Sequence, residues 1–82
     1  MRIDKFLNSV NITKRRSIAQ DMLQSGVVCV NDKVAKPSKD ISVGDIITIS
    51  YLGSEKKYKI LALPSVKSTP KSEQSIYVEE MA

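Results

Sequence analysis

Residue types that support catalysis and metal binding are missing or scarce in this chain. Its 82 residues include no histidine, no tryptophan and only one cysteine, Cys29. Histidine-based catalytic triads, zinc sites built from cysteine and histidine, and disulfide scaffolds are therefore excluded. A chain of this length buries only about 60% of the surface that it exposes when unfolded, so we expect one domain with one small core. The composition predicts a binding module, and neither an enzyme nor a protein that depends on a cofactor.

Long apolar segments are absent as well. No run of eighteen apolar residues occurs, and polar or charged residues interrupt the first twelve positions, which does not fit a secretory signal. Cys29 stands between two valines, a setting typical of a free thiol that packs as a small apolar side chain in a reducing compartment. We therefore expect a cytoplasmic protein that does not contact membranes.

The excess positive charge is concentrated at the amino end. The chain has thirteen Lys and Arg against nine Asp and Glu, a net charge of +4. After residue 16 the two signs are balanced, with eight residues of each. The first sixteen residues have a single acid, Asp4, and these five basic residues: Arg2, Lys5, Lys14, Arg15 and Arg16. A binding site for an anion is therefore expected in this segment.

Two short amphipathic helices are predicted at the amino end. Apolar residues recur there at the three- and four-residue spacing of a helical stripe. The first helix spans about residues 2–9, and the second begins near Lys14, with Thr13 as its N-cap and Gly26 as its left-handed C-terminal cap. The stripes consist of Ile3, Phe6, Leu7 and Val10 in the first helix, and of Ile18, Ala19, Met22 and Leu23 in the second.

Beyond Gly26 the pattern changes to that of an antiparallel sheet with about four strands. The first two strands flank Asn31-Asp32, a dipeptide that tolerates the positive φ of a tight hairpin turn. The other two flank a turn at Gly53-Ser54 and show strand alternation. The four predicted strands cover residues 27–30, 33–35, 46–52 and 57–63. The fold class is α+β, with the two helices packed on the sheet.

The carboxyl-terminal stretch differs in composition. Residues 64–75 are rich in serine and proline and contain Val66 as their only aliphatic residue, which is little apolar surface to offset the entropy of ordering. We expect residues 1–63 to form the domain and residues 64–82 a flexible linker or tail. Within it, residues 73–81 favour either a short helix or an extended segment.

The basic residues of the two helices form the candidate binding site. In the predicted second helix, Lys14, Arg15 and Arg16 crowd into the first turn, where each cation opposes the macrodipole at a cost of about 0.3–1 kcal/mol. Solvated surface charge would explain one such triplet. Cations on both helices instead indicate an anionic ligand, and guanidinium groups suit the phosphates of a nucleic acid. For Asp4 we expect a structural role, orienting Arg15 or Arg16.

These same residues resemble the S4 RNA-binding domain family. The resemblance covers roughly residues 1–52 and lies in the order and spacing of five segments. Asp32 stands where the family usually has glycine after the asparagine, a departure that affects the type of turn. The segments are MRIDKFL at residues 1–7, KRRSIA at 14–19, GVVCVN at 26–31, KPS at 36–38 and VGD at 43–45.

Within the family, the length and the opening residues are most similar to small free-standing bacterial S4 proteins of ribosome-associated quality control, relatives of the heat-shock S4 proteins. The resemblance implies binding to large ribosomal subunits that are obstructed by peptidyl-tRNA, with contacts to ribosomal RNA and tRNA. It also implies support of C-terminal tailing of the stalled chain, with a factor that recruits alanyl-tRNA. We expect a monomer without metal or cofactor. The implied RNA contacts are Arg2, Lys5, Lys14, Arg15, Arg16 and Lys36.

Two other functions stay open at this point. An S4 protein of ribosomal subunit assembly would bind precursor ribosomal RNA. A protein-interaction adaptor would dock through residues 76–81 while the basic face steers association. A metal-dependent nuclease is disfavoured because the candidate carboxylates are scattered over helices and turns. Those carboxylates are Asp4, Asp21, Asp32, Asp40 and Asp45.

Overall fold

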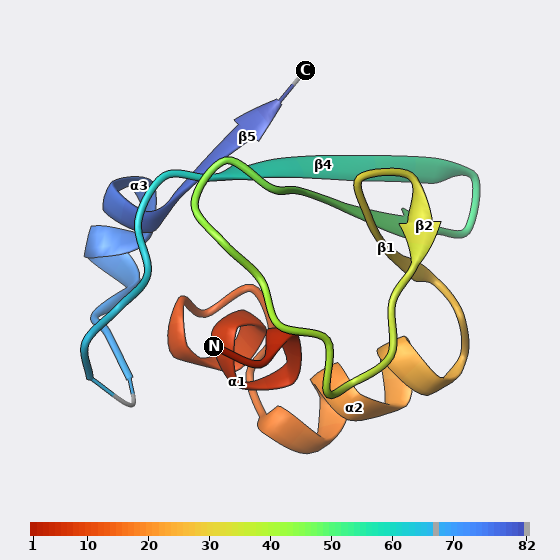
Figure 1. The fold of residues 1–82 in the computed structure, drawn as a ribbon, viewed down its shortest axis with the longest axis horizontal. Coiled ribbons are helices and arrows are strands. Elements are labelled where there is room, and N and C mark those ends of the chain that lie inside the picture. The colour runs from red at the N-terminus through yellow and green to blue at the C-terminus, as the bar shows by residue number, and fades with distance from the viewer. Residues whose placement is uncertain (67, 82) are drawn as a thin grey trace.

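Two amino-terminal helices cover one face of an antiparallel sheet in the computed structural model, which describes residues 1–66 and 68–81 (Figure 1). Neighbouring strands follow the order β2-β1-β3-β4-β5. The elements along the chain are α1 (Ile3–Ser9), α2 (Arg16–Gln24), β1 (Val28–Val30), β2 (Lys33–Val34), β3 (Ile46–Tyr51), β4 (Ser54–Ile60), a 3₁₀ turn (Lys71–Glu73), α3 (Gln74–Tyr77) and β5 (Val78–Met81). The predicted α+β class, with two helices packed on a small antiparallel sheet, is confirmed.

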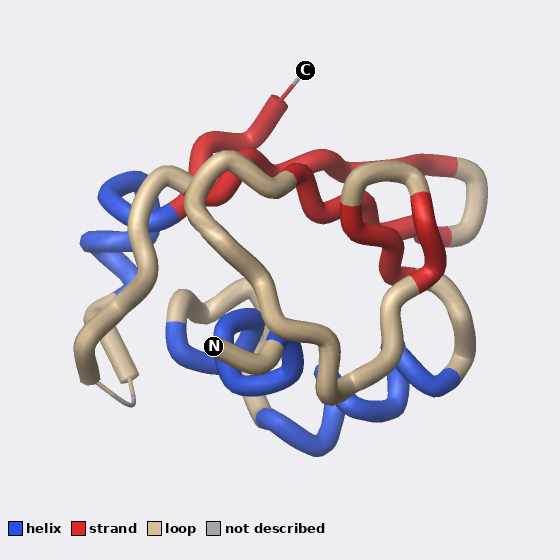
Figure 2. Tube along the Cα trace, in the orientation of Figure 1, coloured by secondary structure: helices blue, strands red, loops and turns tan. Residues whose placement is uncertain are grey.

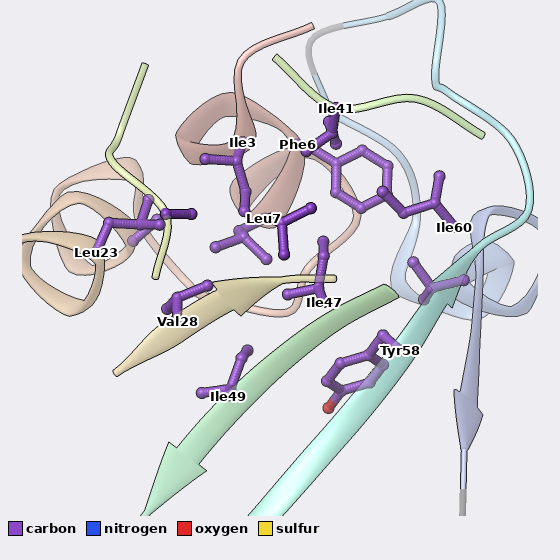
Figure 3. Close-up of a cluster of buried hydrophobic side chains, with 14 of the residues drawn as sticks. Ile3, Phe6, Leu7, Leu23, Val28, Ile41, Ile47, Ile49, Tyr58 and Ile60 are labelled. Carbon is purple, nitrogen blue, oxygen red and sulfur yellow. The ribbon is translucent and has the colours of Figure 1, made fainter. Parts of the chain in front are cut away.

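The core lies between α1 and the inner face of the sheet. Figure 3 shows Phe6 and Leu7 of α1 pointing toward Ile47 and Ile60 of the central strands. All four of these side chains are fully buried. They pack with the rest of the predicted α1 stripe, Ile3 and Val10, which is also fully buried. The helical periodicity at the amino end therefore predicted this half of the core correctly.

The stripe of α2 is narrower than predicted. Ala19 and Leu23 are buried, whereas Met22 is only partly buried and Ile18 is 41% exposed. Successive residues of an α-helix are rotated by about 100°, so Ile18 and Met22 form the row next to the Ala19–Leu23 row. The Ala19–Leu23 row therefore packs into the core, while the neighbouring row lies partly in solvent.

α2 begins at Arg16, two residues later than predicted. Its N-cap is Arg15, in an extended conformation, and no side chain caps the helix. Thr13 is not the N-cap, because its hydroxyl donates to the carbonyl of Arg15. The reason lies in the connection from α1, where the backbone N–H groups of Ile12 and Thr13 both donate to the carbonyl of Leu7. Only one of the three consecutive cations therefore lies in the helix.

The C-terminal cap of α2 follows the prediction. Gly26 has a φ of +77°, the left-handed conformation that glycine adopts without a steric penalty. The N–H of Gly26 donates to the carbonyl of Leu23, and the N–H of Val27 donates to that of Met22. This is the hydrogen-bond pattern of a Schellman motif, which ends the helix and turns the chain into β1.

The two hairpins differ in how well their turns were predicted. Asn31 and Asp32 have φ values of 51° and 69°, as a tight turn with two left-handed residues requires, so the first hairpin is confirmed. In the second hairpin the turn is Leu52-Gly53, one residue earlier than expected, because Tyr51 pairs with Ser54. The strand β4 accordingly begins at residue 54 and ends at residue 60.

The sheet has a fifth strand, which corrects the expected four. Strand β5 pairs with β4, and Val78 lies opposite Ile60 with its side chain buried. Figure 2 shows the long loop that leaves the sheet after β4 and returns through α3 to this strand. A short helix and an extended segment were both open for residues 73–81, and both occur there: the helix α3 spans Gln74–Tyr77 and the strand β5 follows it.

Polar contacts fix the stretch before β5 to the C-terminal end of α1. The backbone N–H and the hydroxyl of Thr69 both donate to the carbonyl of Ser9, at 3.0 and 2.8 Å. The amide of Gln74 donates to the carbonyl of Val10 at 2.7 Å, and that of Asn11 donates to the carbonyl of Thr69. Carbonyls at the end of a helix are common sites for such bonds, and these contacts join the stretch before β5 to the end of α1.

Candidate nucleic-acid interface

A buried carboxylate joins the basic residues of the two helices. Asp4, in the first turn of α1, has no exposed surface. Its Oδ2 accepts hydrogen bonds from Nη2 of Arg2 at 3.1 Å, from Nε and Nη2 of Arg16 at 3.4 Å, and from Nε2 of Gln20 at 3.1 Å. Its Oδ1 accepts from the backbone N–H of Lys5 at 2.7 Å. We call this arrangement of Arg2, Asp4, Arg16 and Gln20 the Asp4 cluster.

The Asp4 cluster keeps its carboxylate charged. Burial by itself raises the pKa of the Asp4 carboxyl. The hydrogen bonds from Gln20 and from the N–H of Lys5, together with the charges of Arg16 and Arg2, outweigh burial and lower the pKa below its usual value. Asp4 is therefore ionised at neutral pH and holds both guanidinium groups.

The lowered pKa of Asp4 predicts how stability depends on pH. An acid whose pKa is lower in the folded state contributes stability that is complete above its unfolded pKa and is lost as pH falls through its folded pKa. We expect the free energy of unfolding to fall below about pH 4, and to fall less steeply in Asp4→Asn. Urea unfolding between about pH 7 and about pH 2 measures both curves. Asp21→Asn, an exposed aspartate on α2, controls for the loss of a carboxylate, and equal slopes in Asp4→Asn and the wild type would contradict the prediction.

The side chains of the other expected site residues lie on three segments of the structure and are exposed. Lys5 is exposed on α1, and Lys14 and Arg15 are exposed in the connection before α2. Lys36 is exposed in the loop that follows β2. Of the two arginines considered as partners of Asp4, the structure brings Arg16 to it, and adds Arg2.

The loop after β2 lies directly on the N-terminal end of α1. The backbone N–H of Ile3 donates to the carbonyl of Lys39 at 2.8 Å, and that of Asp4 donates to the carbonyl of Pro37 at 3.4 Å. No side chain caps α1, so these loop carbonyls satisfy N–H groups that a helix leaves free at its start. The contact fixes the loop beside Arg2.

Two exposed lysines near this loop were missed by the sequence reasoning. Lys33 on β2 and Lys39 in the loop flank Lys36 at three-residue spacing. The signal in the sequence is this regular spacing next to a hairpin turn, but Asp32 and Asp40 offset most of the positive charge of residues 32–40. The basic surface is therefore broader than the helix pair.

Metal and membrane features are not found in the part of the chain that the structure describes. Residues 1–66 and 68–81 contain no group of three or more Asp, Glu, Cys or His side chains arranged to hold a metal ion. Within the same residues, every helix is too short or too polar to cross a membrane.

Comparison with known proteins identifies the family. A profile of the S4 domain matches residues 1–47. The RQC P-site tRNA stabilizing factor of Helicobacter pylori strain J99 is 45% identical over 78 residues, which cover 95% of this chain and 93% of the relative. The protein of the same name in Bacillus subtilis is 32% identical over 75 residues, covering 92% and 84%. The chain therefore belongs to the S4 domain family, as the resemblance in its first half indicated.

Solved structures agree with this assignment. The trimeric structure of Vibrio cholerae heat shock protein 15 superposes with a TM-score of 0.88 at 32% identity, covering 100% of this chain and 82% of that one. The solution structure of a hypothetical protein superposes with a TM-score of 0.85 at 41% identity, covering 100% and 98%. The S4-type fold thus extends through β5.

Proposed function

We propose that the chain is an RNA-binding factor of ribosome-associated quality control that binds large ribosomal subunits obstructed by peptidyl-tRNA. The observation that carries the proposal is the Asp4 cluster. The side chains of Arg2 and Arg16 bond to a fully buried carboxylate, yet 48% and 46% of their surfaces stay exposed. Relatives named for stabilising P-site tRNA, of nearly the same length, support this choice.

The geometry suits phosphate recognition. A guanidinium carries five N–H donors in a planar fork, so an arginine that uses one or two donors to bond Asp4 has others for a ligand. Holding the side chain in place before binding lowers the entropy lost on binding. Double-stranded RNA presents phosphates and 2′-hydroxyls in a wide, shallow groove, and two oriented cations on a rigid helix pair fit that shape without reading sequence.

The proposal assigns the remaining roles as follows. Asp4 positions the arginines, and the protein acts in the cytoplasm as a monomer without catalysis of its own. By occupying the obstructed subunit it supports C-terminal tailing of the stalled chain with a factor that recruits alanyl-tRNA. The residues that contact ribosomal RNA and tRNA are Arg2, Lys5, Lys14, Arg15, Arg16 and Lys36.

Co-sedimentation tests the proposed function. The purified protein should pellet with large subunits that carry peptidyl-tRNA, and only weakly with vacant subunits or with immature particles. Preference for immature particles would favour a role in subunit assembly. The adaptor alternative is weakened by the fold, because Val78, inside its docking segment, is buried against β4.

Salt dependence is the second measurable consequence. If four or five of these six cations contact phosphates, the logarithm of affinity falls with the logarithm of salt concentration at a slope of about −3 to −4. The slope is measured by repeating the co-sedimentation, or fluorescence anisotropy with a labelled RNA stem-loop, over a salt series. A slope near zero would contradict binding through the phosphates.

A further inference from the structure

A cavity of about 520 Å³ lies between the β1–β2 hairpin and the loop that follows it. This volume falls in the range of about 300–1,000 Å³ found for pockets that bind small molecules. Part of its wall is apolar, and the rest bears cations. The apolar side chains are Val30, Val34 and Ala35, and the cations are Lys33, Lys36 and Lys39.

The charges of the cavity favour an anion. Among the described residues that line it are three lysines and no carboxylate. All three lysines are exposed residues, and Lys36 and Lys39 lie on the loop fixed to α1. Lysine binds phosphate as a point charge on a flexible side chain, so the three lysines can follow a phosphate in more than one position.

The apolar wall favours a ligand that has an apolar group as well as an anionic one. Val34 belongs to β2, an edge strand of two residues, and 66% of its side chain is exposed. Val30 and Ala35 beside it are buried in the core and form a rigid backing. A nucleotide has both groups: a flat base that packs on side chains when it is unstacked, and a phosphate that pairs with cations.

Asn31, which also lines the cavity, is already engaged within the protein. Its Nδ2 donates to Oδ1 of Asp45 at 3.1 Å, and its Oδ1 accepts the backbone N–H of Ile46 at 3.0 Å. Both ends of the amide therefore hold the hairpin to β3.

The cavity and the basic helix pair share one loop. The backbone of the loop that carries Lys36 and Lys39 bonds to the N–H groups of Ile3 and Asp4, at the start of the helix that presents Arg2. One RNA ligand that contacts Arg2 therefore has cations of the cavity wall on the segment bonded to that helix.

We propose that this cavity receives one unstacked nucleotide of an RNA strand, with its base against Val34 and its phosphate at Lys36 and Lys39. The inference rests on the proposed function and deepens it, since it adds a single-stranded subsite to a surface for duplex RNA.

Nuclear magnetic resonance of the ¹⁵N-labelled full chain tests the subsite directly. AMP should shift the amide resonances of residues 30–39 and bind more tightly than ribose 5-phosphate. Val34→Ser should weaken the binding of AMP about three- to tenfold, the loss expected for one or two methyl groups. The affinity for ribose 5-phosphate should stay unchanged. Val43→Ser, at a valine that is 60% exposed outside the cavity, is the matched control and should change neither. Equal affinity for both ligands, or no shifts at residues 30–39, overturns the subsite.

An RNA probe separates this inference from the proposed function. A stem-loop with a single bulged adenosine should bind about three- to tenfold more tightly than the same stem-loop with an abasic bulge, and Val34→Ser should remove the difference. If the wild type binds obstructed subunits but shows no preference for the adenosine bulge, only the subsite fails. If the preference is present and obstructed subunits are not bound, the proposed function fails and the subsite stands.

Discussion

Replacing Arg16 by alanine is expected to weaken binding to obstructed large subunits by about ten- to hundredfold, the loss that follows from one or two hydrogen bonds to a charged group. Arg16 is the cation that α2 presents through the buried Asp4, so its removal takes away a donor that is already oriented for phosphate. The affinity is measured by co-sedimentation with obstructed subunits, over a series of protein concentrations.

The fold of Arg16→Ala should stay nearly intact. Asp4 keeps its bonds to Arg2, Gln20 and the N–H of Lys5, and the lost pair at 3.4 Å involves an arginine that is 46% exposed. Such half-solvated pairs contribute about 0–1 kcal/mol. A melting temperature close to that of the wild type, beside a large loss of affinity, separates a binding role from a structural one.

Two further variants control for charge and for the shape of the side chain. Lys59→Ala also removes one positive charge, but Lys59 lies between the inward-facing Tyr58 and Ile60, so it faces away from the helices and should affect binding little. Arg16→Lys keeps the charge and loses the planar fork, and should bind with intermediate affinity. If Lys59→Ala weakens binding as much as Arg16→Ala, net charge and not the Asp4 cluster controls affinity.

Deleting residues 64–82 is expected to unfold the protein. The deletion removes the buried Val78, worth about 1.5–3 kcal/mol, and the bonds that Thr69 and Gln74 make to the end of α1, worth about 0.5–1.5 kcal/mol each. The total is comparable with the whole stability of a small domain. Circular dichroism and amide dispersion in nuclear magnetic resonance report the result.

A milder variant measures what one of these bonds contributes to the free energy of unfolding. Thr69→Val keeps the shape of the side chain but loses the hydroxyl that donates to the carbonyl of Ser9. The bond from the backbone N–H of residue 69 to the same carbonyl remains. We expect a loss of about 1 kcal/mol in the free energy of unfolding by urea. Native-like dispersion in the chain of residues 1–63 would show that the carboxyl-terminal stretch is dispensable for folding.

The features that the sequence predicted well depend on neighbours in the chain. The stripe of α1, the Gly26 cap and the Asn31-Asp32 turn each follow from a period or from a backbone angle within a few residues. The family could also be identified, because its motifs are contiguous segments in the first half of the chain. These local signals were sufficient for the fold class and for the position of the basic segment.

The features that were missed depend on distant residues. The composition of residues 64–75 gives no sign that Thr69 bonds to a carbonyl of α1, because that acceptor lies sixty residues away. The late start of α2 follows from bonds to Leu7, and the bond from Gln20 to Asp4 joins two helices across sixteen residues. Polar burial of this kind leaves no periodic trace in the sequence.

Both ends of α1 are completed by segments that are made much later during translation. Its first N–H groups use the carbonyls of Pro37 and Lys39, and its last carbonyls use Thr69 and Gln74. A helix of seven residues has little stability of its own. While the chain emerges from a ribosome, the helix that presents Arg2 therefore stays unfinished until nearly all of the protein is free. The basic face is synthesised first and assembled last, so we expect a nascent copy to lack firmly positioned arginines until Thr69 and Gln74 have left the ribosome.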